Sequence, residues 1–469
     1  MNCKSYFLLG GLIITGALSL KAQDESLKPN FILILADDLG WSSTSTKMDD
    51  NVAESKSDYF DTPNIERMAE NGLRFSHGYA SASISSPTRR SIQYGQTPVR
   101  QGDINFKKNY HPDNNKRLSI PELLKKIDPE YKTAHYGKWD IRSDFFPEDI
   151  GYDESDGNTG NKDGNLHSDP IAKWTNFFLT SDPKKIVTLT ARAQNFMERQ
   201  VRSSNPFYLQ ISHYATHVDI QANESTLKKY WRKEPGKAHG NPGFAAMLED
   251  LDTGIGKIIE KVYELGIEKN TYIIFMADNG GVELIPQTNS KMIHPSEYIR
   301  PRMNYPLRGG KWTLYEGGIR VPFIVMGPGI TGGTQSDTPV TGWDLLPTIA
   351  DLAGYKDNLP DDLDGGSFKK ILTGNLNATI VRPQEALIFH RYNNHYPHSA
   401  VIKGDYKLVK LWDTDKTELY NLSKDIGEVN NLSNDFPEKV NELFSILISY
   451  MKEVESEILE YRNHSIRSK

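Results

Sequence analysis

Runs of apolar residues with the length of single strands constrain the fold of this chain more than any other feature. Those at 30–36, 207–212 and 271–276 are largely apolar, which is typical of strands buried on both faces of a sheet. Helical periodicity separates the runs and is clearest over 244–265. Strands that alternate with helices predict an α/β fold, with a large mixed, mostly parallel sheet sandwiched by helices.

The pattern changes toward the C-terminus. Segments 400–403 and 406–412 predict a hairpin that turns on Gly404-Asp405, and a helix is predicted over 436–458. Strands grouped with one helix indicate a smaller α+β domain with an antiparallel sheet. We therefore predict an N-terminal α/β domain over 23–380 and a C-terminal α+β subdomain over 381–469.

The first 22 residues have the pattern of a signal peptide. Lys4 supplies the positive end, 6–20 form the apolar stretch, and Ala22 is a small residue at the cleavage position. The alternative is an uncleaved anchor, for which the apolar stretch is short. Cys3 is the only cysteine, so the mature chain has no disulfide. We expect an exported protein, in the periplasm, secreted or at the cell surface.

Charge narrows the range of partners. The chain has 55 Lys and Arg against 61 Asp and Glu, a net charge of −6. This balance argues against nucleic acid as the main partner. The sequence also has no Walker-type or Gly-x-Gly-x-x-Gly phosphate loop.

Chemically versatile side chains follow the predicted strands directly. In open parallel sheets, ligands bind beyond the carboxyl ends of the strands, so we expect these side chains to share one site. They are Asp37 and Asp38 after 30–36, Lys138 and Asp140 after 131–136, His217 after 207–212, and Asp278 and Asn279 after 271–276.

The combined set suits a metal ion and an oxyanion. Three carboxylates and an amide carbonyl favour a hard cation such as Ca²⁺, and no histidine or cysteine pattern indicates zinc. Lys138, Lys311 and an arginine would bind a substrate oxyanion and stabilise its charge as an ester bond breaks. His217 is a candidate acid for a leaving alkoxide.

The pentapeptide Ser85-Ser86-Pro87-Thr88-Arg89 predicts a helix start. Pro87 is tolerated in the first turn, and Ser85 or Ser86 is expected at the N-cap. A hydroxyl there, with Arg89 one turn on, makes a cradle for an anion. The alternative is an ordinary capped helix.

These residues resemble the type I, formylglycine-dependent sulfatase family within the alkaline-phosphatase-like superfamily, and most of all its carbohydrate sulfatases. The resemblance covers nearly the whole mature chain. It rests on the pentapeptide and on Ala36-Asp37-Asp38-Leu39-Gly40-Trp41, Asp61-Thr62-Pro63-Asn64, Gly137-Lys138-Trp139, Ala277-Asp278-Asn279-Gly280, Gly310-Lys311, Gly404-Asp405-Tyr406-Lys407-Leu408 and Glu418-Leu419-Tyr420-Asn421-Leu422.

The resemblance implies that Ser85 is oxidised to formylglycine, which makes this a serine-type enzyme that needs a maturation enzyme. It also implies that Arg89 holds the hydrated aldehyde and that Lys138 and Lys311 bind sulfate. His217 matches the histidine near the leaving oxygen. The residues that match calcium ligands are Asp37, Asp38, Asp278 and Asn279, and Asp278 is also a candidate base for the attacking hydroxyl.

Two places need separate hypotheses. The family commonly has histidine where this chain has Asp140, so we hypothesise that Asp140 is the base for sulfate release or binds a sugar hydroxyl. The segment 389–398 resembles family members that act on carbohydrates, and we expect His390, Arg391 or His395 to reach the substrate. A solvated loop is the alternative.

The sequence thus predicts an exported, Ca²⁺-dependent sulfatase that removes sulfate from a glycan, more readily at a chain end than within the chain. One alternative is a phosphatase or phosphodiesterase of the same superfamily. Those enzymes commonly use two metal ions and need a second set of Asp and His ligands, whereas the sequence after Asp278 offers only one set. The other is a non-catalytic protein that binds sulfated glycans with Ser85 unconverted.

Overall fold

The computed structural model describes residue 1 and residues 28–102, 117–142, 144–165, 177–282, 303–391 and 397–456. All but the first residue of the predicted signal peptide, and His395, lie outside the described residues. Within the described part of the chain, no helix has both the length and the apolar composition to cross a membrane.

An eight-stranded mixed sheet forms the centre of the molecule, in the order β11-β2-β10-β9-β1-β7-β4-β5. Strands β9, β1, β7, β4 and β5 are parallel, whereas β10 runs antiparallel to both β9 and β2. The bounds are β1 Asn30–Ala36, β2 Leu73–Phe75, β4 Lys132–Gly137, β5 Glu154–Ser155, β7 Phe207–Ser212, β9 Thr271–Ala277, β10 Phe323–Met326 and β11 Thr334–Ser336. The predicted α/β class is confirmed.

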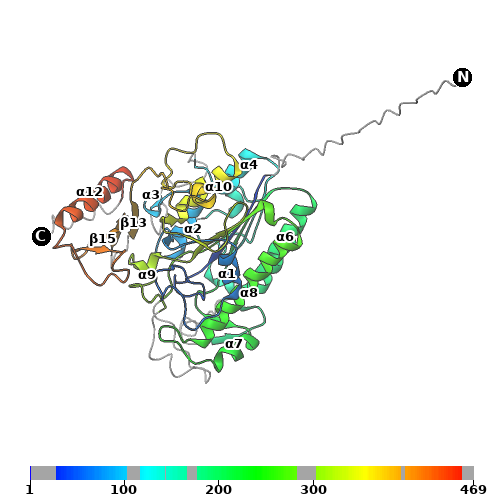
Figure 1. The fold of residues 1–469 in the computed structure, drawn as a ribbon, viewed down its shortest axis with the longest axis horizontal. Helices are drawn as coiled ribbons and strands as arrows, with labels where there is room; N and C mark the ends of the chain where they lie inside the picture. Colours follow the sequence, from blue (N-terminus) through cyan, green and yellow to red (C-terminus); the bar gives the residue numbers. More distant parts are fainter. Residues whose placement is uncertain are drawn as a thin grey trace.

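Helices cover both faces of this sheet (Figure 1). One layer contains α1 (Pro63–Glu70), α6 (Ile186–Arg202) and α8 (Pro242–Glu264), which pack on one another. The other contains α2 (Ser85–Tyr94), α4 (Ile120–Ile127) and α10 (Leu345–Ala353). The predicted helix over 244–265 is confirmed as α8, whose buried stripe includes Leu251, Ile255 and Ile259.

Shorter elements complete the N-terminal part. They are β3 (Gly78–Tyr79), β6 (Phe177–Leu179), β8 (Ile220–Ala222), β12 (Val340–Thr341), α3 (Pro98–Gln101), α7 (Glu224–Trp231), α9 (Glu316–Ile319) and α11 (Lys369–Leu372). Strand β10 begins at Phe323, three residues after Arg320, which is the C-cap of α9. Its side chain bonds to Glu316 inside that turn.

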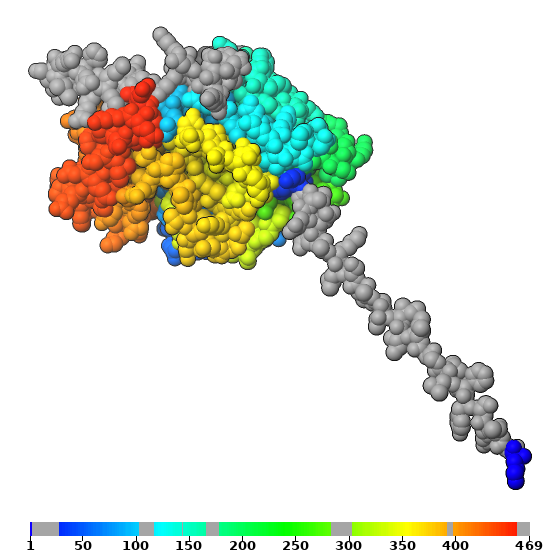
Figure 2. All heavy atoms as spheres, turned by 90° about the horizontal axis from the view of Figure 1, so that it is seen from above, coloured from blue at the N-terminus to red at the C-terminus, as the bar shows by residue number. Residues whose placement is uncertain are grey.

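The C-terminal segment forms a separate four-stranded antiparallel sheet, as predicted. Its strands are β13 (Leu387–Arg391), β14 (His398–Lys403), β15 (Tyr406–Leu411) and β16 (Thr417–Asn421), and α12 (Pro437–Glu453) packs on one face. This part is the orange and red lobe beside the main body (Figure 2). The domain boundary at residue 380 stays a prediction.

The other face of this small sheet joins the main body. Phe389 of β13 contacts Trp343 and Tyr79, with ring centroids 5.3 and 5.9 Å apart. Leu314 belongs to the same buried cluster. The loop that carries Lys311 therefore lies between the two sheets.

Candidate active site

The carboxylates predicted to follow β1 and β9 meet at the carboxyl edge of the sheet. Ala36 pairs in register with Ala277, so the two loops start level with each other. The Asp38 amide donates to Asp278 Oδ1 at 3.1 Å. Asp37, Asp38 and Asp278 are buried, and each offers an oxygen within 4.8 Å of the others. This arrangement has the donors and the size for one metal ion.

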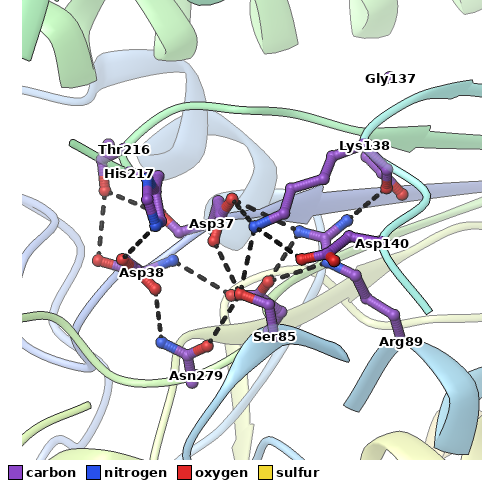
Figure 3. A network of polar contacts seen from close by, with 12 residues as sticks. Asp37, Asp38, Ser85, Arg89, Gly137, Lys138, Asp140, Thr216, His217 and Asn279 are labelled. Atoms are coloured by element: carbon purple, nitrogen blue, oxygen red, sulfur yellow. Dashed lines mark hydrogen bonds and ion pairs between the residues drawn. The ribbon is translucent and has the colours of Figure 1, made fainter. Parts of the chain in front are cut away.

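Asn279 adds a fourth oxygen to this cluster (Figure 3). Its side-chain nitrogen donates to Asp38 Oδ1 at 2.7 Å, and its Oδ1 lies 3.3 Å from Ser85 Oγ. Burial, together with the negative charge of Asp37, raises the pKa of Asp278 to about 6. Buried carboxylates this close are stable as anions only beside positive charge, and an all-oxygen set of this kind fits a hard divalent cation.

Ser85 lies at the centre of the contacts, but not as a helix cap. Helix α2 begins at Ser85 itself, and its N-cap is Ile84 in extended conformation with no side-chain hydrogen bond. The expectation of Ser85 or Ser86 at the N-cap is therefore wrong. The Ser85 hydroxyl instead donates to Asp37 Oδ1 at 3.1 Å and lies 3.3 Å from Lys138 Nζ. Pro87 lies in the first turn, as predicted.

A positively charged side chain pairs with each carboxylate. Arg89, one turn after Ser85, donates to Asp278 Oδ2 through Nη2 at 2.7 Å. Lys138 Nζ donates to Asp37 Oδ2 at 2.7 Å, and Lys311 Nζ donates to Asp38 Oδ2 at 2.8 Å. Burial alone would raise the pKa of Asp37, but Lys138 and the other nearby positive groups hold it well below its usual range.

His217 approaches the same cluster from the loop after β7. Its Nε2 lies 3.8 Å from Asp38 Oδ2, and its Nδ1 lies 2.6 Å from the Val218 carbonyl. A carbonyl only accepts, so Nδ1 carries a proton and Nε2 is the atom that faces the site. Burial and the neighbouring Lys311 lower the pKa of His217 to about 4.

Asp140 lies at the more open side of the site. Its Oδ2 is 3.5 Å from Lys138 Nζ, and its side chain keeps 21% of its surface exposed, whereas that of Lys138 keeps 1%. Its backbone has φ 43°, and its amide donates to the Thr159 carbonyl. The structure thus brings Asp140 next to a lysine of the site while leaving its carboxylate reachable.

The predicted sugar-contacting residues lie in the other sheet. His390 and Arg391 are buried in β13, and His390 Nδ1 lies 2.8 Å from Ser399 Oγ of β14. Burial and His398 lower the pKa of His390 to about 3. Their role in binding sugar stays a prediction, as does that of His395, which lies outside the described residues.

Two residues that the sequence analysis did not single out belong to the surroundings of the site. Thr216 donates to the backbone carbonyls of Asp37 and Asp38 at 3.1 and 3.2 Å, which holds the turn of the loop. Lys184 is buried and donates to Asp219 Oδ1 at 2.8 Å. Burial lowers the pKa of Lys184, and the charge of Lys138 adds to this effect. The charges of Asp219 and Asp37 act to raise it but do not outweigh burial. Thr216 lies in the same loop as His217, but a threonine there carries no chemical signal of its own, and Lys184 follows no strand predicted from the sequence.

This fold and this cluster define the class: an enzyme with an α/β fold that combines a carboxylate metal site with oxyanion-binding positive charges around one hydroxyl. The chain belongs to the Sulfatase family, whose model matches residues 29–355. A second model, N-sulphoglucosamine sulphohydrolase, C-terminal, matches residues 310–457. The protein is therefore a sulfuric ester hydrolase, and the phosphatase alternative is not supported.

Individual relatives match over most of their length. A sulfatase of Formosa agariphila is 28% identical, with 91% of this chain and 89% of that protein covered. The N-acetylgalactosamine-6-sulfatase of Mus musculus is 29% identical, with 90% and 79% covered. The crystal structure of Ps i-CgsB in complex with k-i-k-neocarrahexaose is similar at 25% identity and a TM-score of 0.72, with 90% and 92% covered.

Proposed function

We propose that this protein is an exported sulfatase that removes sulfate from a carbohydrate, with a formylglycine made from Ser85 and a bound Ca²⁺. The observation that carries the proposal is the position of Ser85 Oγ. It lies within 3.3 Å of Asp37 Oδ1, Asn279 Oδ1 and Lys138 Nζ at once. A nucleophile at this point would contact both the metal site and the positive groups that bind a sulfate.

The carbohydrate substrate is supported by the relatives. One of them is named an N-acetylgalactosamine-6-sulfatase, and a similar structure holds a neocarrahexaose. The apolar run at the N-terminus supports export, and action at a chain end is the hypothesis from the long loops of the sequence. Besides the sulfated carbohydrate, the expected partner is a maturation enzyme that converts Ser85 to formylglycine.

Asp37, Asp38, Asp278 and Asn279 would hold the Ca²⁺, because the three carboxylates form a buried, closely spaced set and the buried Asn279 amide is bonded to Asp38. A bound Ca²⁺ supplies positive charge that stabilises negative charge on the sulfate oxygens. The hydrated formylglycine supplies two hydroxyl groups, one to attack sulfur and one to expel sulfate. An unmodified serine would lack the second.

The remaining residues bind and transfer protons. Lys138, bonded to Asp37, and Lys311, bonded to Asp38, orient the sulfate and offset its charge. Arg89 holds the position of the hydrate and of Asp278, which is a candidate base because its pKa is near 6. His217 presents Nε2 toward the site and, once Nε2 has taken up a proton in addition to the one at Nδ1, would pass it to the leaving sugar oxygen.

Peptide mass spectrometry around Ser85 tests this proposal. The protein is produced with a serine-type maturation enzyme, and the peptide that contains Ser85 is compared with that of Ser85→Ala. Loss of two hydrogens at residue 85, together with sulfate release from N-acetylgalactosamine 6-sulfate or carrageenan oligosaccharides, is the expected result. A fully unmodified Ser85 in protein that still releases sulfate would overturn the formylglycine route.

A further inference from the structure

Trp312 stands apart from the other tryptophans of the described chain. It is 44% exposed, whereas Trp41, Trp139, Trp343 and Trp412 are buried and Trp231 is half-buried. Large aromatic side chains normally contribute to folding by being removed from water. The partly exposed Trp312 contributes less in this way than a buried tryptophan.

The backbone at Trp312 adds a second cost. Its φ is 78°, in the left-handed region, where a bulky residue is a genuine outlier and glycine is free of strain. Gly309 in the same loop adopts a similar φ of 71°. Fold stability would therefore favour glycine at position 312, and strain of this kind is concentrated at functional sites.

The loop fixes this indole beside the active site. The Trp312 amide donates to the Ser83 carbonyl at 2.8 Å, two residues before Ser85. Lys311 Nζ bonds Asp38 and lies 5.6 Å from the centre of the Trp312 ring. Two residues further on, the Leu314 amide donates to His398 Nε2 of β14 at 2.9 Å. The backbone that carries the ring is thus fixed at residues 312 and 314, next to one of the positive groups of the sulfate site.

We propose that Trp312 is a specificity-determining residue, on whose indole face the sugar ring that carries the sulfate stacks. This inference rests on the proposed carbohydrate substrate. One face of a pyranose ring carries C–H groups, which suit the electron-rich face of an indole, while the sugar hydroxyls remain free for polar partners. The lysine at 311 would hold the sulfate while Trp312 holds the ring beside it.

A different role for Trp312 is to orient Lys311 by a cation–π contact. The two roles predict different binding behaviour. If Trp312 is a platform for the sugar ring, its loss weakens the binding of sulfated sugars and hardly changes the binding of inorganic sulfate, which has no ring. If Trp312 instead supports Lys311, its loss weakens the binding of both ligands equally.

The test measures binding by calorimetry in calcium buffer, with Ser85→Ala as the parent so that no substrate is consumed. Ligands are N-acetylgalactosamine 6-sulfate, neocarrahexaose and inorganic sulfate. Adding Trp312→Gly should raise the Kd of a bound sulfated sugar by about 10-fold or more, and that of inorganic sulfate by less than about 3-fold. Trp312→Phe keeps an aromatic face and should restore most of the sugar affinity.

Tyr263→Ala is the matched control. Tyr263 is also an exposed aromatic residue, but it lies near the end of α8, just before the start of β9, whereas the active site lies beyond the end of β9. Thermal unfolding of Trp312→Gly should occur no lower than in the parent, because strain is removed. Equal losses for sugar and sulfate, or unchanged sugar affinity, would overturn the proposal. If no sugar binds the parent and wild-type protein hydrolyses none, the carbohydrate function itself fails, and the platform with it.

Discussion

Asp140 stands where the resemblance to sulfatases leads us to expect a histidine, and it allows a sharp prediction. Its carboxylate lies 3.5 Å from Lys138 Nζ and remains partly exposed. If it is the base for sulfate release, Asp140→Asn should lower kcat by about 10²–10⁴-fold while substrate binding changes little. Sulfated enzyme should then accumulate, which intact mass spectrometry detects as one added sulfuryl group.

Asp153→Asn is the matched control for this substitution. Asp153 is also a carboxylate paired with a lysine, Lys125, but it lies at the start of β4 and β5 and not at their carboxyl ends. Its substitution should leave kcat unchanged. Full turnover in Asp140→Asn would exclude the base role, and a rise in KM at unchanged kcat would favour a hydroxyl-binding role instead.

At the scale of elements, the strands explain which parts of the site the sequence could predict. Asp37, Lys138 and Asp278 directly follow strands of the sheet, so their meeting at one edge follows from the parallel arrangement. Lys311 follows no predicted strand, so its meeting with the other site residues could not be inferred from the strand ends. The left-handed backbone of Trp312 depends on contacts with Ser83, far away in the sequence, which no local pattern encodes.

The turn after β9 depends on a glycine for close packing. A Cβ at Gly280 would lie 1.8 Å from the Gly317 carbonyl oxygen, and the Gly280 amide donates to the Gly318 carbonyl. Gly280→Ala should force this turn away from α9, lower the free energy of unfolding by about 1–3 kcal/mol and displace the neighbouring Asn279. Thermal unfolding and sulfatase activity should both fall. Gly160→Ala, which meets nothing within 4 Å, should change neither.

The loops after β1 and β9 should also respond to the metal. Their three carboxylates lie within 4.8 Å of one another, so a bound cation removes repulsion that exists only in the folded state. The thermal unfolding midpoint should rise with Ca²⁺ concentration, fall on chelation and recover on adding Ca²⁺ back. Mg²⁺ should substitute poorly, because it demands stricter geometry and keeps its waters. Equal midpoints with Ca²⁺ and with chelator would contradict a calcium site, and Asp38→Asn should abolish the shift.

At the scale of the whole molecule, a buried ionic network joins the two sheets. Lys407 of β15 contacts Glu316 of α9 at 2.8 Å and Glu428 at 2.9 Å, and all three side chains are fully buried. Arg320 donates to Glu316 on its other side. Burial alone would raise the pKa of Glu316, but Lys407 and Arg320 lower it to about 2. For Glu428 the balance is the reverse: burial and the charge of Glu316 raise its pKa to about 7, although Lys407 acts to lower it.

These shifts predict how the joint between the sheets depends on pH. Glu428 has a pKa of about 7 when folded, against 4.5 as its ordinary value. Between these values the folded state holds more protons than the unfolded state, so stability falls as pH rises through 7. Glu428→Gln mimics the protonated form. It should match the wild type near pH 5 and exceed its free energy of unfolding near pH 8 by on the order of 1–3 kcal/mol.

Thermal unfolding of both proteins across this pH range provides the measurement, with Glu418→Gln as a control in the same sheet. Glu418 accepts from Tyr315 and Tyr420 at its partly exposed position and should show no such crossover. A Glu428→Gln protein that is less stable than the wild type at pH 8 would mean that the ion pair with Lys407 outweighs burial. The two sheets hold the Lys311 loop between them through Leu314 and His398. Weaker contacts between the two sheets at alkaline pH should therefore reduce sulfate binding before the chain unfolds.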